Sequence, residues 1–258
     1  MENVSFRLPA RLIVIIFACS LVVTSSSSRA ESICSEGSRT SLVKMVTTLG
    51  EIELTLCSED APGTVENFLA YVNSGAYTDS GIIHRSIQQV GVENGTFIFQ
   101  GGGFFVDSTQ NGVLFLNTVP AEDPIEMEDG LAHLRGTIAM ARWTTPNSAT
   151  SQWFINVETN TWGSPYAVFG SVSEDSLATV DAIAALPIEA INQGLLLNTP
   201  LDAYPGGNES FFPYLVGVTD VIDLPEPSSA AQSLAALLAL IFLARYRAAG
   251  VSGRSHLG

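Results

Sequence analysis

The sequence predicts a mainly β fold, a closed β-barrel with two helices. Short runs rich in β-branched and aromatic residues recur along the chain between turns of Gly, Pro and Asn. Only two segments show the apolar spacing of an amphipathic helix. Many short strands with so few helices favour a closed barrel. The 258 residues are enough for one domain with a substantial core and additional segments at both ends.

The first elements are two strands and a helix. The strands lie in the run LVKMVTTLGEIELTL, residues 42–56, and Leu49-Gly50 between them is a hairpin signal. The helix follows Ala61-Pro62-Gly63 and ends at Gly75. Its apolar positions recur at i, i+3, i+4 and i+7 and are Val65, Phe68, Leu69 and Val72.

The rest of the body contains further strands and a second helix. Apolar runs predict strands near Ile82 and Phe97 and over residues 136–141, 153–157 and 167–172. The second helix is predicted over 176–185, with one apolar face formed by Leu177, Val180 and Ile183. A last strand is predicted over 214–222.

The N-terminal 30 residues have the pattern of a secretory signal peptide. Arg7 and Arg11 precede the apolar run 12–23, and Ser28-Arg29-Ala30 supplies a small-x-small cleavage pattern. We expect cleavage after Ala30. The alternative is an uncleaved membrane anchor, although the run is shorter than the roughly 20 apolar residues that span a bilayer.

The C-terminal segment, residues 224–258, forms a tail separate from the predicted domain at 31–223. Pro225 and Pro227 resist helix continuation. Residues 230–244 carry no charge and are followed by arginines, at positions 245, 247 and 254. Such a segment can cross a bilayer with its positive charge inside, which predicts a transmembrane helix. The alternative is an amphipathic or core helix.

The body of the chain is strongly acidic. The whole sequence has a net charge of −15, and residues 31–227 contain every Asp and Glu except Glu2 but only five of the eleven Lys and Arg. This balance argues against a nucleic-acid partner, because phosphate binding depends on clustered cations. With so few cations in the body, each arginine is informative.

Two cysteines remain after the predicted cleavage, Cys34 and Cys57. An even pair in an exported chain is typical of a disulfide. Alternation in residues 51–57 places Cys57 on the outer face of its strand, and Cys34 precedes the first strand, free to fold across that face. We expect a Cys34–Cys57 bridge; the alternative is two unpaired thiols.

Five motifs follow one another in the body: IHRSI with FIFQGGGF, GLAHLRGTIAMAR, SATSQWFINV and YAVFGSV, behind GEIELTL and APGTVENFLAYVNSGAY. In this order they closely resemble a cyclophilin-type peptidyl-prolyl cis-trans isomerase of the bacterial kind. The resemblance covers roughly residues 43–221. It implies an eight-stranded antiparallel barrel capped by two helices, an isomerase without cofactor or metal, and proline-containing polypeptides as substrates.

The resemblance also implies a set of site residues. Arg85 matches the catalytic arginine of the family, and Gln100 is expected to bind the substrate carbonyl or orient Arg85. The implied substrate-binding residues are Phe97, Ile98, Ala141, Arg142, Gln152, Phe154, Trp162 and Tyr166. The sequence departs from the family pattern in two ways: Ile98 replaces a methionine that many members have, and residues 86–96 form a longer loop.

The chemistry of prolyl isomerisation fits these residue types. Twisting the amide leaves a lone pair on the prolyl nitrogen, which a guanidinium donor stabilises, and an apolar pocket excludes the water that favours the planar form. This reaction needs no base or nucleophile. We expect His84 to be structural, because its side chain points away from that of Arg85 in a strand. His133 has no acidic or cysteine partner at ligand spacing, so no metal site is expected.

The tail resembles a PEP-CTERM sorting signal of bacterial exported proteins, since Pro225-Glu226-Pro227 precedes an apolar run and a basic end. In that family an exosortase recognises and removes the tail. The resemblance implies an exported protein, located in the periplasm, on the outer surface or outside the cell, with transient membrane anchoring by the C-terminal helix.

Three function classes are compatible with these observations. They are an active prolyl isomerase, a cyclophilin-like module that binds proline-containing segments with little catalysis, and an unrelated barrel that holds a small ligand. The third does not explain the ordered motifs. An isomerase assay on a proline peptide separates the first two.

Overall fold

The computed structural model of the protein describes residues 33–36, 40–78, 80–89, 96–109, 111–161, 166–191, 196–206 and 210–224. The predicted signal peptide, the predicted sorting tail and Trp162 lie outside these residues. In the part of the chain that is described, no helix is long and apolar enough to cross a membrane.

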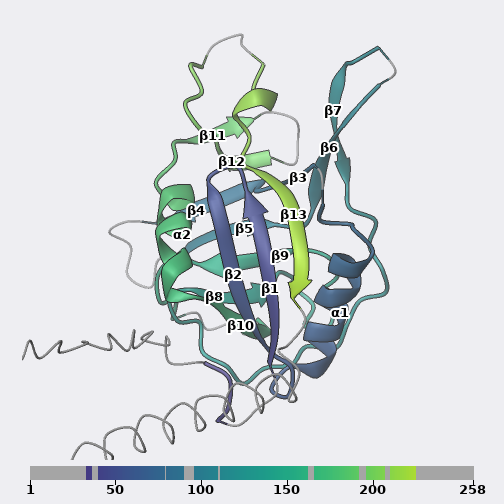
Figure 1. Cartoon of the computed structure of the whole chain (residues 1–258), viewed down its shortest axis with the longest axis vertical. Helices are drawn as coiled ribbons and strands as arrows, with labels where there is room; N and C mark the ends of the chain where they lie inside the picture. The colour runs from purple at the N-terminus through teal and green to yellow at the C-terminus, as the bar shows by residue number, and fades with distance from the viewer. Residues whose placement is uncertain are drawn as a thin grey trace, which may run out of the picture.

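Eleven strands form one antiparallel sheet (Figure 1). Their bounds are Thr40–Thr47 (β1), Gly50–Cys57 (β2), Gly81–Ile82 (β3), Arg85–Gln88 (β4), Phe97–Gly101 (β5), Phe104–Ser108 (β6), Leu114–Thr118 (β7), Thr137–Met140 (β8), Trp153–Asn156 (β9), Val168–Val172 (β10) and Gly217–Leu224 (β13). The order across the sheet is β4-β5-β9-β8-β10-β2-β1-β13-β3-β6-β7.

The structure confirms a mainly β fold with few helices and corrects the number of strands. The eight predicted strands are present in the large sheet, where β4, β6 and β7 add to them, and β11 and β12 form a separate small sheet. Among the described residues no pairing joins β4 to β7, the two ends of the order, so these pairings do not show a closed sheet. The eight-stranded closed barrel of the sequence analysis therefore stays a prediction.

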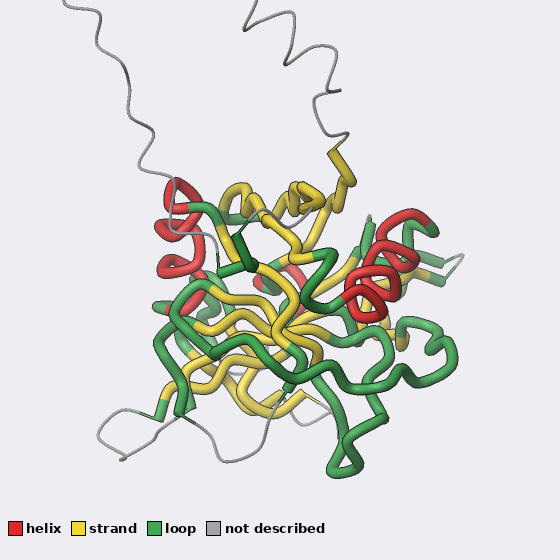
Figure 2. Tube along the Cα trace, turned by 90° about the horizontal axis from the view of Figure 1, so that it is seen from below, coloured by secondary structure: helices red, strands yellow, loops and turns green. Residues whose placement is uncertain are grey.

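Two α-helices flank the strands on opposite sides, as Figure 2 shows from below. They are α1, Pro62–Asn73, and α2, Leu177–Ala184. Helix α1 has Pro at its first position, which fits because Pro fixes φ and lacks an N–H that would have no partner there. Gly75, at φ 76°, lies just beyond its end, where glycine adopts a left-handed conformation without strain.

The main hydrophobic core lies between the sheet and the two helices. Alternate residues of β1 and β2 point into it, as the sequence pattern predicts. Its largest fully buried side chains include Phe68 of α1, Phe99, Trp153 and Phe169. Burial of each such aromatic side chain stabilises the fold by about 1.5–3 kcal/mol, so this core is the main source of stability.

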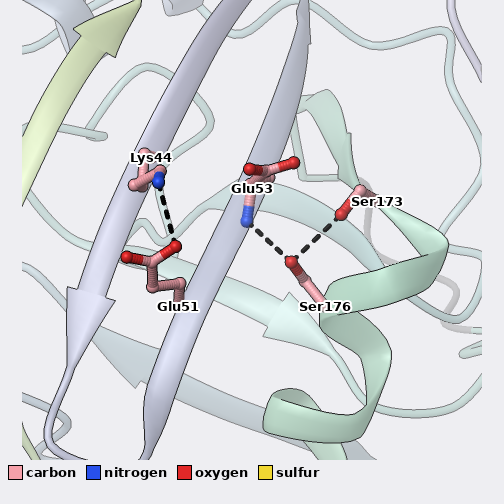
Figure 3. A network of polar contacts seen from close by, with 5 residues as sticks. All are labelled: Lys44, Glu51, Glu53, Ser173 and Ser176. Carbon is pink, nitrogen blue, oxygen red and sulfur yellow. Dashed lines mark hydrogen bonds and ion pairs between the residues drawn. The ribbon is translucent and has the colours of Figure 1, made fainter.

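Polar contacts attach the 3₁₀ turn that precedes α2, Glu174–Ser176, to the backbone of β2 (Figure 3). The backbone N–H of Glu53 donates to Ser176 Oγ at 2.9 Å, and Ser173 Oγ donates to the same oxygen at 3.0 Å. Lys44 and Glu51 form an exposed ion pair of 2.9 Å on neighbouring strands. The serine contacts fix the position of α2, whereas an exposed pair of this kind contributes little.

A second hydrophobic cluster lies beside the main core and was not predicted. It is formed by Ile82, Phe104, Ile191, Leu201 and Leu215. Through it, the described parts of the segment 187–216, which are residues 187–191, 196–206 and 210–216, pack against β3 and β6. This segment contains a separate two-stranded sheet of β11, Ile188–Ile191, and β12, Leu196–Pro200, and a short 3₁₀ helix, Phe212–Tyr214. The sequence analysis had no element between the second helix and the last strand.

Candidate active site

Four neighbouring strands place the central site residues in one row. Arg85 of β4 pairs with Gln100 of β5, Gln100 pairs with Phe154 of β9, and Phe154 pairs with Ala139 of β8. Directly paired residues on neighbouring strands have their side chains on the same face of the sheet. The register therefore brings together the cation, the amide and the aromatic side chain that the motifs single out.

Hydrogen bonds link the polar side chains of this row. Arg85 Nη1 donates to Gln100 Oε1 at 3.3 Å, and Gln100 Nε2 donates to Gln152 Oε1 at 2.6 Å. Gln100 is 8% exposed, so both ends of its amide are engaged in a nearly water-free position. Of the two roles expected for Gln100, this geometry matches the orientation of Arg85.

The three glycines after Gln100 leave space for the side chains of β9 and the residues before it. A Cβ on Gly101 would lie 2.6 Å from Trp153 Cζ2, and one on Gly103 would lie 2.8 Å from the side-chain amide carbon of Gln152. Gly102, at φ 76°, would place a Cβ 2.6 Å from the carbonyl oxygen of Ser151. A side chain at Gly103 would therefore displace Gln152, the partner of Gln100, and one at Gly101 or Gly102 would displace Trp153, the residue next to it.

A cavity of about 550 Å³ opens beside the Arg85–Gln100–Gln152 chain. Five predicted site residues border it: Arg85, Gln100, Ala141, Arg142 and Gln152. Sequence reasoning missed the other bordering residues, which are His84, Phe104, Thr118, Trp143, Ser148, Thr150 and Asn198. Trp143, which is 79% exposed, directly follows a quoted motif, and this position in the sequence could have identified it. Two other hollows, of about 440 and 620 Å³, border α1 and contain none of the predicted residues.

An apolar cluster continues the row beyond Gln100. It consists of Ile98, Ala139, Phe154 and Val168, with Tyr166 and Ala141 packed against it. The rings of Phe154 and Tyr166 meet edge to face at 5.3 Å, and the guanidinium carbon of Arg142 lies 5.0 Å from the centre of the Tyr166 ring. Ile98 and Phe154 are nearly buried and do not border the cavity, so they form the base of the apolar cluster.

Phe97 does not join this group. It packs against the main core, with Phe99 on the same face of β5, because side chains alternate along a strand and Gln100 and Ile98 occupy the other face. The expectation that Phe97 borders the substrate pocket therefore finds no match in the cavity. Trp162 lies outside the described residues.

His84 is buried and borders the cavity as well. Two effects lower the pKa of His84 from 6.5 to about 4: burial, which is the larger, and the positive charge of Arg85. The ring is therefore neutral at pH 7. Its ring lies edge to face on Phe104 at 4.9 Å, and Nδ1 has no hydrogen-bond partner among the described residues. A neutral, packed ring agrees with the structural role expected for it.

His133 lies on the apolar cluster. Its ring stacks on Phe154 at 6.0 Å, and Nδ1 is 3.4 Å from Asn156 Nδ2. Burial lowers its pKa, an effect that the charge of Asp129 and the backbone of Tyr166 oppose. This position makes His133 part of the apolar wall.

Cys34 and Cys57 are joined by a disulfide, with their Cα atoms 5.1 Å apart. Asp60 lies close to both sulfur atoms. The disulfide removes the thiolates that a metal ion would require there. Ile33, next to the bridge, packs against the apolar cluster that contains Phe154, a contact that the sequence did not indicate.

A family model described as "Cyclophilin type peptidyl-prolyl cis-trans isomerase/CLD" matches residues 42–199. The match spans more than half of the chain, and it contains Arg85, Gln100 and every strand of the row. The protein belongs to this family and is a cyclophilin-type peptidyl-prolyl cis-trans isomerase, as the ordered motifs predict.

Curated bacterial relatives agree with the family match. The chain is 44% identical to peptidyl-prolyl cis-trans isomerase cyp18 of Streptomyces antibioticus over 154 residues, which are 55% of this chain and 82% of the relative. It is 40% identical to peptidyl-prolyl cis-trans isomerase A of Dickeya dadantii over 164 residues, 61% of this chain and 77% of the relative. A solved cyclophilin-type isomerase from Cryptosporidium parvum shares the fold, with a TM-score of 0.51 and 22% identity over 73% of this chain and 100% of that chain.

Proposed function

We propose that the protein accelerates rotation about X-Pro bonds of exported polypeptides, with Arg85 as the donor to the prolyl nitrogen. The observation that carries the proposal is the hydrogen-bonded chain from Arg85 through Gln100 to Gln152, which borders a cavity next to an apolar cluster. A substrate backbone in this cavity would lie along Ala141 and Arg142.

The charge distribution of the reaction explains why one cation is sufficient. An X-Pro amide is held planar by resonance, with a rotation barrier of about 18–20 kcal/mol. Twisting removes the resonance and localises the lone pair on nitrogen. Arg85 then donates to an atom that is basic only in the twisted state, so it stabilises the transition state more than the planar substrate.

The required stabilisation is modest. A rate acceleration on the order of 10⁵ corresponds to about 7 kcal/mol. An oriented donor in a water-poor site supplies about 2.7–4 kcal/mol of such an effect. We assign the rest to the exclusion of water from the planar amide by the apolar cluster beside the cavity, which borders it through Ala141. The division predicts different consequences for the loss of Arg85 and of Phe154.

The direct test is Arg85→Ala in a protease-coupled assay on an Ala-Pro-Phe peptide. We expect kcat/KM to fall by about 10², equivalent to roughly 2.7 kcal/mol, with little change in melting temperature. Arg85→Lys restores the rate only in part, because an ammonium group lacks the planar fork of donors. Phe154→Ala weakens peptide binding as well, because it removes the buried ring that supports Tyr166 and the rest of the apolar cluster beside the cavity.

Arg135→Ala is the matched control. It removes one positive charge, as Arg85→Ala does, but Arg135 pairs with Asp181 at 2.8 Å and does not border the cavity. We expect its kcat/KM to equal that of the wild type. Normal turnover by Arg85→Ala would refute the catalytic assignment. A wild type that binds proline peptides without isomerising them would identify a binding module instead.

We further propose that the protein is exported and anchored transiently by its C-terminal segment before an exosortase-like enzyme removes it. The pattern of residues 1–30 and the Pro-Glu-Pro tail with its basic end support this proposal. The Cys34–Cys57 disulfide supports it too, because disulfides persist in oxidising compartments. The clients are then proline-containing polypeptides outside the cytoplasm.

A further inference from the structure

We propose that Asn198 is a substrate-binding residue. Its side chain binds a backbone peptide group of the client outside the X-Pro pair, so the protein favours long peptides over short ones. The inference rests on the proposed isomerase function, because it assigns Asn198 to the same cavity as Arg85. Asn198 comes from β12, a strand of the separate two-stranded sheet, and belongs to none of the five motifs.

The backbone of β12 is irregular at this residue. Along the pair β11–β12, Ile191 is opposite Leu196 and Glu189 is opposite Thr199, so β12 contains one residue more than its partner. Asn198 lies in this bulge with φ 64°, a left-handed conformation that Asn adopts more readily than most residues. Bulges change the direction of a side chain, and they occur frequently beside active sites.

The residues that follow Asn198 hold it against the site. Thr199, fully buried, donates its Oγ1 proton to the carbonyl oxygen of His84 at 3.0 Å. Leu201, also fully buried, belongs to the second hydrophobic cluster together with Phe104, which borders the cavity. The bulge is therefore anchored both to the chain next to Arg85 and to a packed core, so Asn198 has a fixed position at the cavity.

The side chain of Asn198 is available for a ligand. It is exposed, and no hydrogen bond joins it to any other residue that the structure describes. Gln100 and Gln152, the other amides of the cavity, are already bonded to each other. Asn198 consequently adds an unused amide, with both a donor and an acceptor, to the wall of the cavity that contains Arg85.

This pair of groups matches one ligand chemistry, an extended peptide backbone. A side-chain amide can accept from a peptide N–H and donate to a peptide carbonyl. The proline and the residue before it are assigned to Arg85 and the apolar cluster. Asn198 therefore contacts a peptide group farther along the client, and long peptides benefit from it while short ones do not.

Three variants separate a ligand contact from a backbone role. Asn198→Gly removes the side-chain amide, and glycine still adopts the left-handed backbone conformation without strain. Asn198→Asp keeps the size of the side chain and still tolerates the left-handed backbone conformation, but it replaces the N–H donor by a negative charge. Asn198→Ala combines loss of the amide with backbone strain. Each is compared on two substrates: a tetrapeptide around Ala-Pro, and a peptide with the same core extended by four residues on each side.

We expect Asn198→Gly to raise KM for the long peptide by about fivefold, the effect of one lost neutral hydrogen bond, with kcat unchanged. Its KM for the tetrapeptide equals that of the wild type. Melting temperatures of Gly and wild-type proteins agree, whereas Asn198→Ala melts lower. A Gly variant with wild-type KM on both peptides would show that Asn198 serves the bulge alone and would overturn the inference.

Failure of the proposed function has a different signature. An inactive wild type, or an Arg85→Ala variant with normal turnover, contradicts the isomerase mechanism whatever Asn198 does. Binding of the long peptide, measured by fluorescence anisotropy with a labelled probe, tests Asn198 without any turnover. An affinity ratio of about five between wild type and Asn198→Gly supports the contact, and a ratio of one rejects it.

Discussion

Gln100 is the residue on which the geometry of the site depends. Its carbonyl accepts from Arg85 and its amide donates to Gln152, so one planar group connects β4 to the residue that precedes β9. The sequence places a glutamine near an arginine but leaves its role open between substrate binding and orientation. The structure favours orientation because both ends of the amide are occupied.

His84 yields a prediction for the pH dependence of stability. Its pKa in the folded protein is about 4, below the usual 6.5, so between these values the unfolded chain binds a proton that the folded one does not. The contribution of neutral His84 to the free energy of unfolding is fully present above pH 6.5 and is lost as the pH falls towards 4. The loss is about 3 kcal/mol, to be measured as urea midpoints between pH 7 and 4.5.

The control for this prediction is His84→Gln, which cannot titrate. We expect its stability to fall less steeply over the same interval, while the difference between the two proteins is constant above pH 7. His133, whose pKa is also lowered by burial, contributes to the slope that remains. Equal slopes in both proteins would mean that His84 is not buried in a neutral form.

At the scale of elements, α1 receives its cap from a distant part of the chain. Ala61 at its N-cap makes no side-chain hydrogen bond. Instead Glu128 accepts from the backbone N–H of Gly63 at 3.0 Å and of Thr64 at 2.8 Å, and from Thr64 Oγ1 at 2.7 Å. A carboxylate at a helix N-terminus also interacts favourably with the helix dipole.

Glu128→Ala is therefore expected to destabilise the protein by about 1–2 kcal/mol, since it leaves free N–H groups at the start of α1. The nearby Glu126→Ala is the matched control, because Glu126 is exposed and makes no hydrogen bond to the described residues. Chemical denaturation compares the two. If the variants have the same midpoint, the capping role of Glu128 is wrong. Isomerase activity is unchanged in either case.

For the molecule as a whole, the disulfide contributes to stability through chain entropy. Cys34 and Cys57 are 23 residues apart, and closure of a loop of that length stabilises by roughly 3 kcal/mol in the chain-entropy model. We expect Cys34→Ser with Cys57→Ser to lower the denaturation midpoint accordingly. Reductant is expected to lower the midpoint of the wild type but not of the double variant. A wild type insensitive to reductant and with two alkylatable thiols would refute the bridge.

Export and processing predict the mass of the mature chain. In a bacterial host with an exosortase, we expect secreted protein to begin near Glu31 and to lack Arg245 and Arg247. Intact-mass analysis of secreted material determines both ends. The matched variant replaces Pro225 and Pro227 by Ala, and we expect it to retain the tail. Secreted wild type that still contained the C-terminal arginines would contradict the sorting proposal.

The sequence by itself determined the family, the predicted strands, α1 and α2, and the pairing of Arg85 with Gln100 in one site. These properties depend on local information: apolar periodicity reports secondary structure, and motifs in a fixed order report a family. The prediction was weaker within β5, where Phe97 and Ile98 were both assigned to the pocket. Neighbours in a strand face opposite sides, and only the packing of β5 shows which side faces the site.

The tertiary structure alone decided the rest of the cavity. Asn198 and Thr118 lie far from Arg85 in the sequence, and only the packing of β12 and the pairing of β6 with β7 bring them to the same space. Glu128 reaches α1 for the same kind of reason, across 64 residues. Such contacts have no periodicity or spacing in the sequence, because they depend on strand register and packing between segments that meet only in the folded chain.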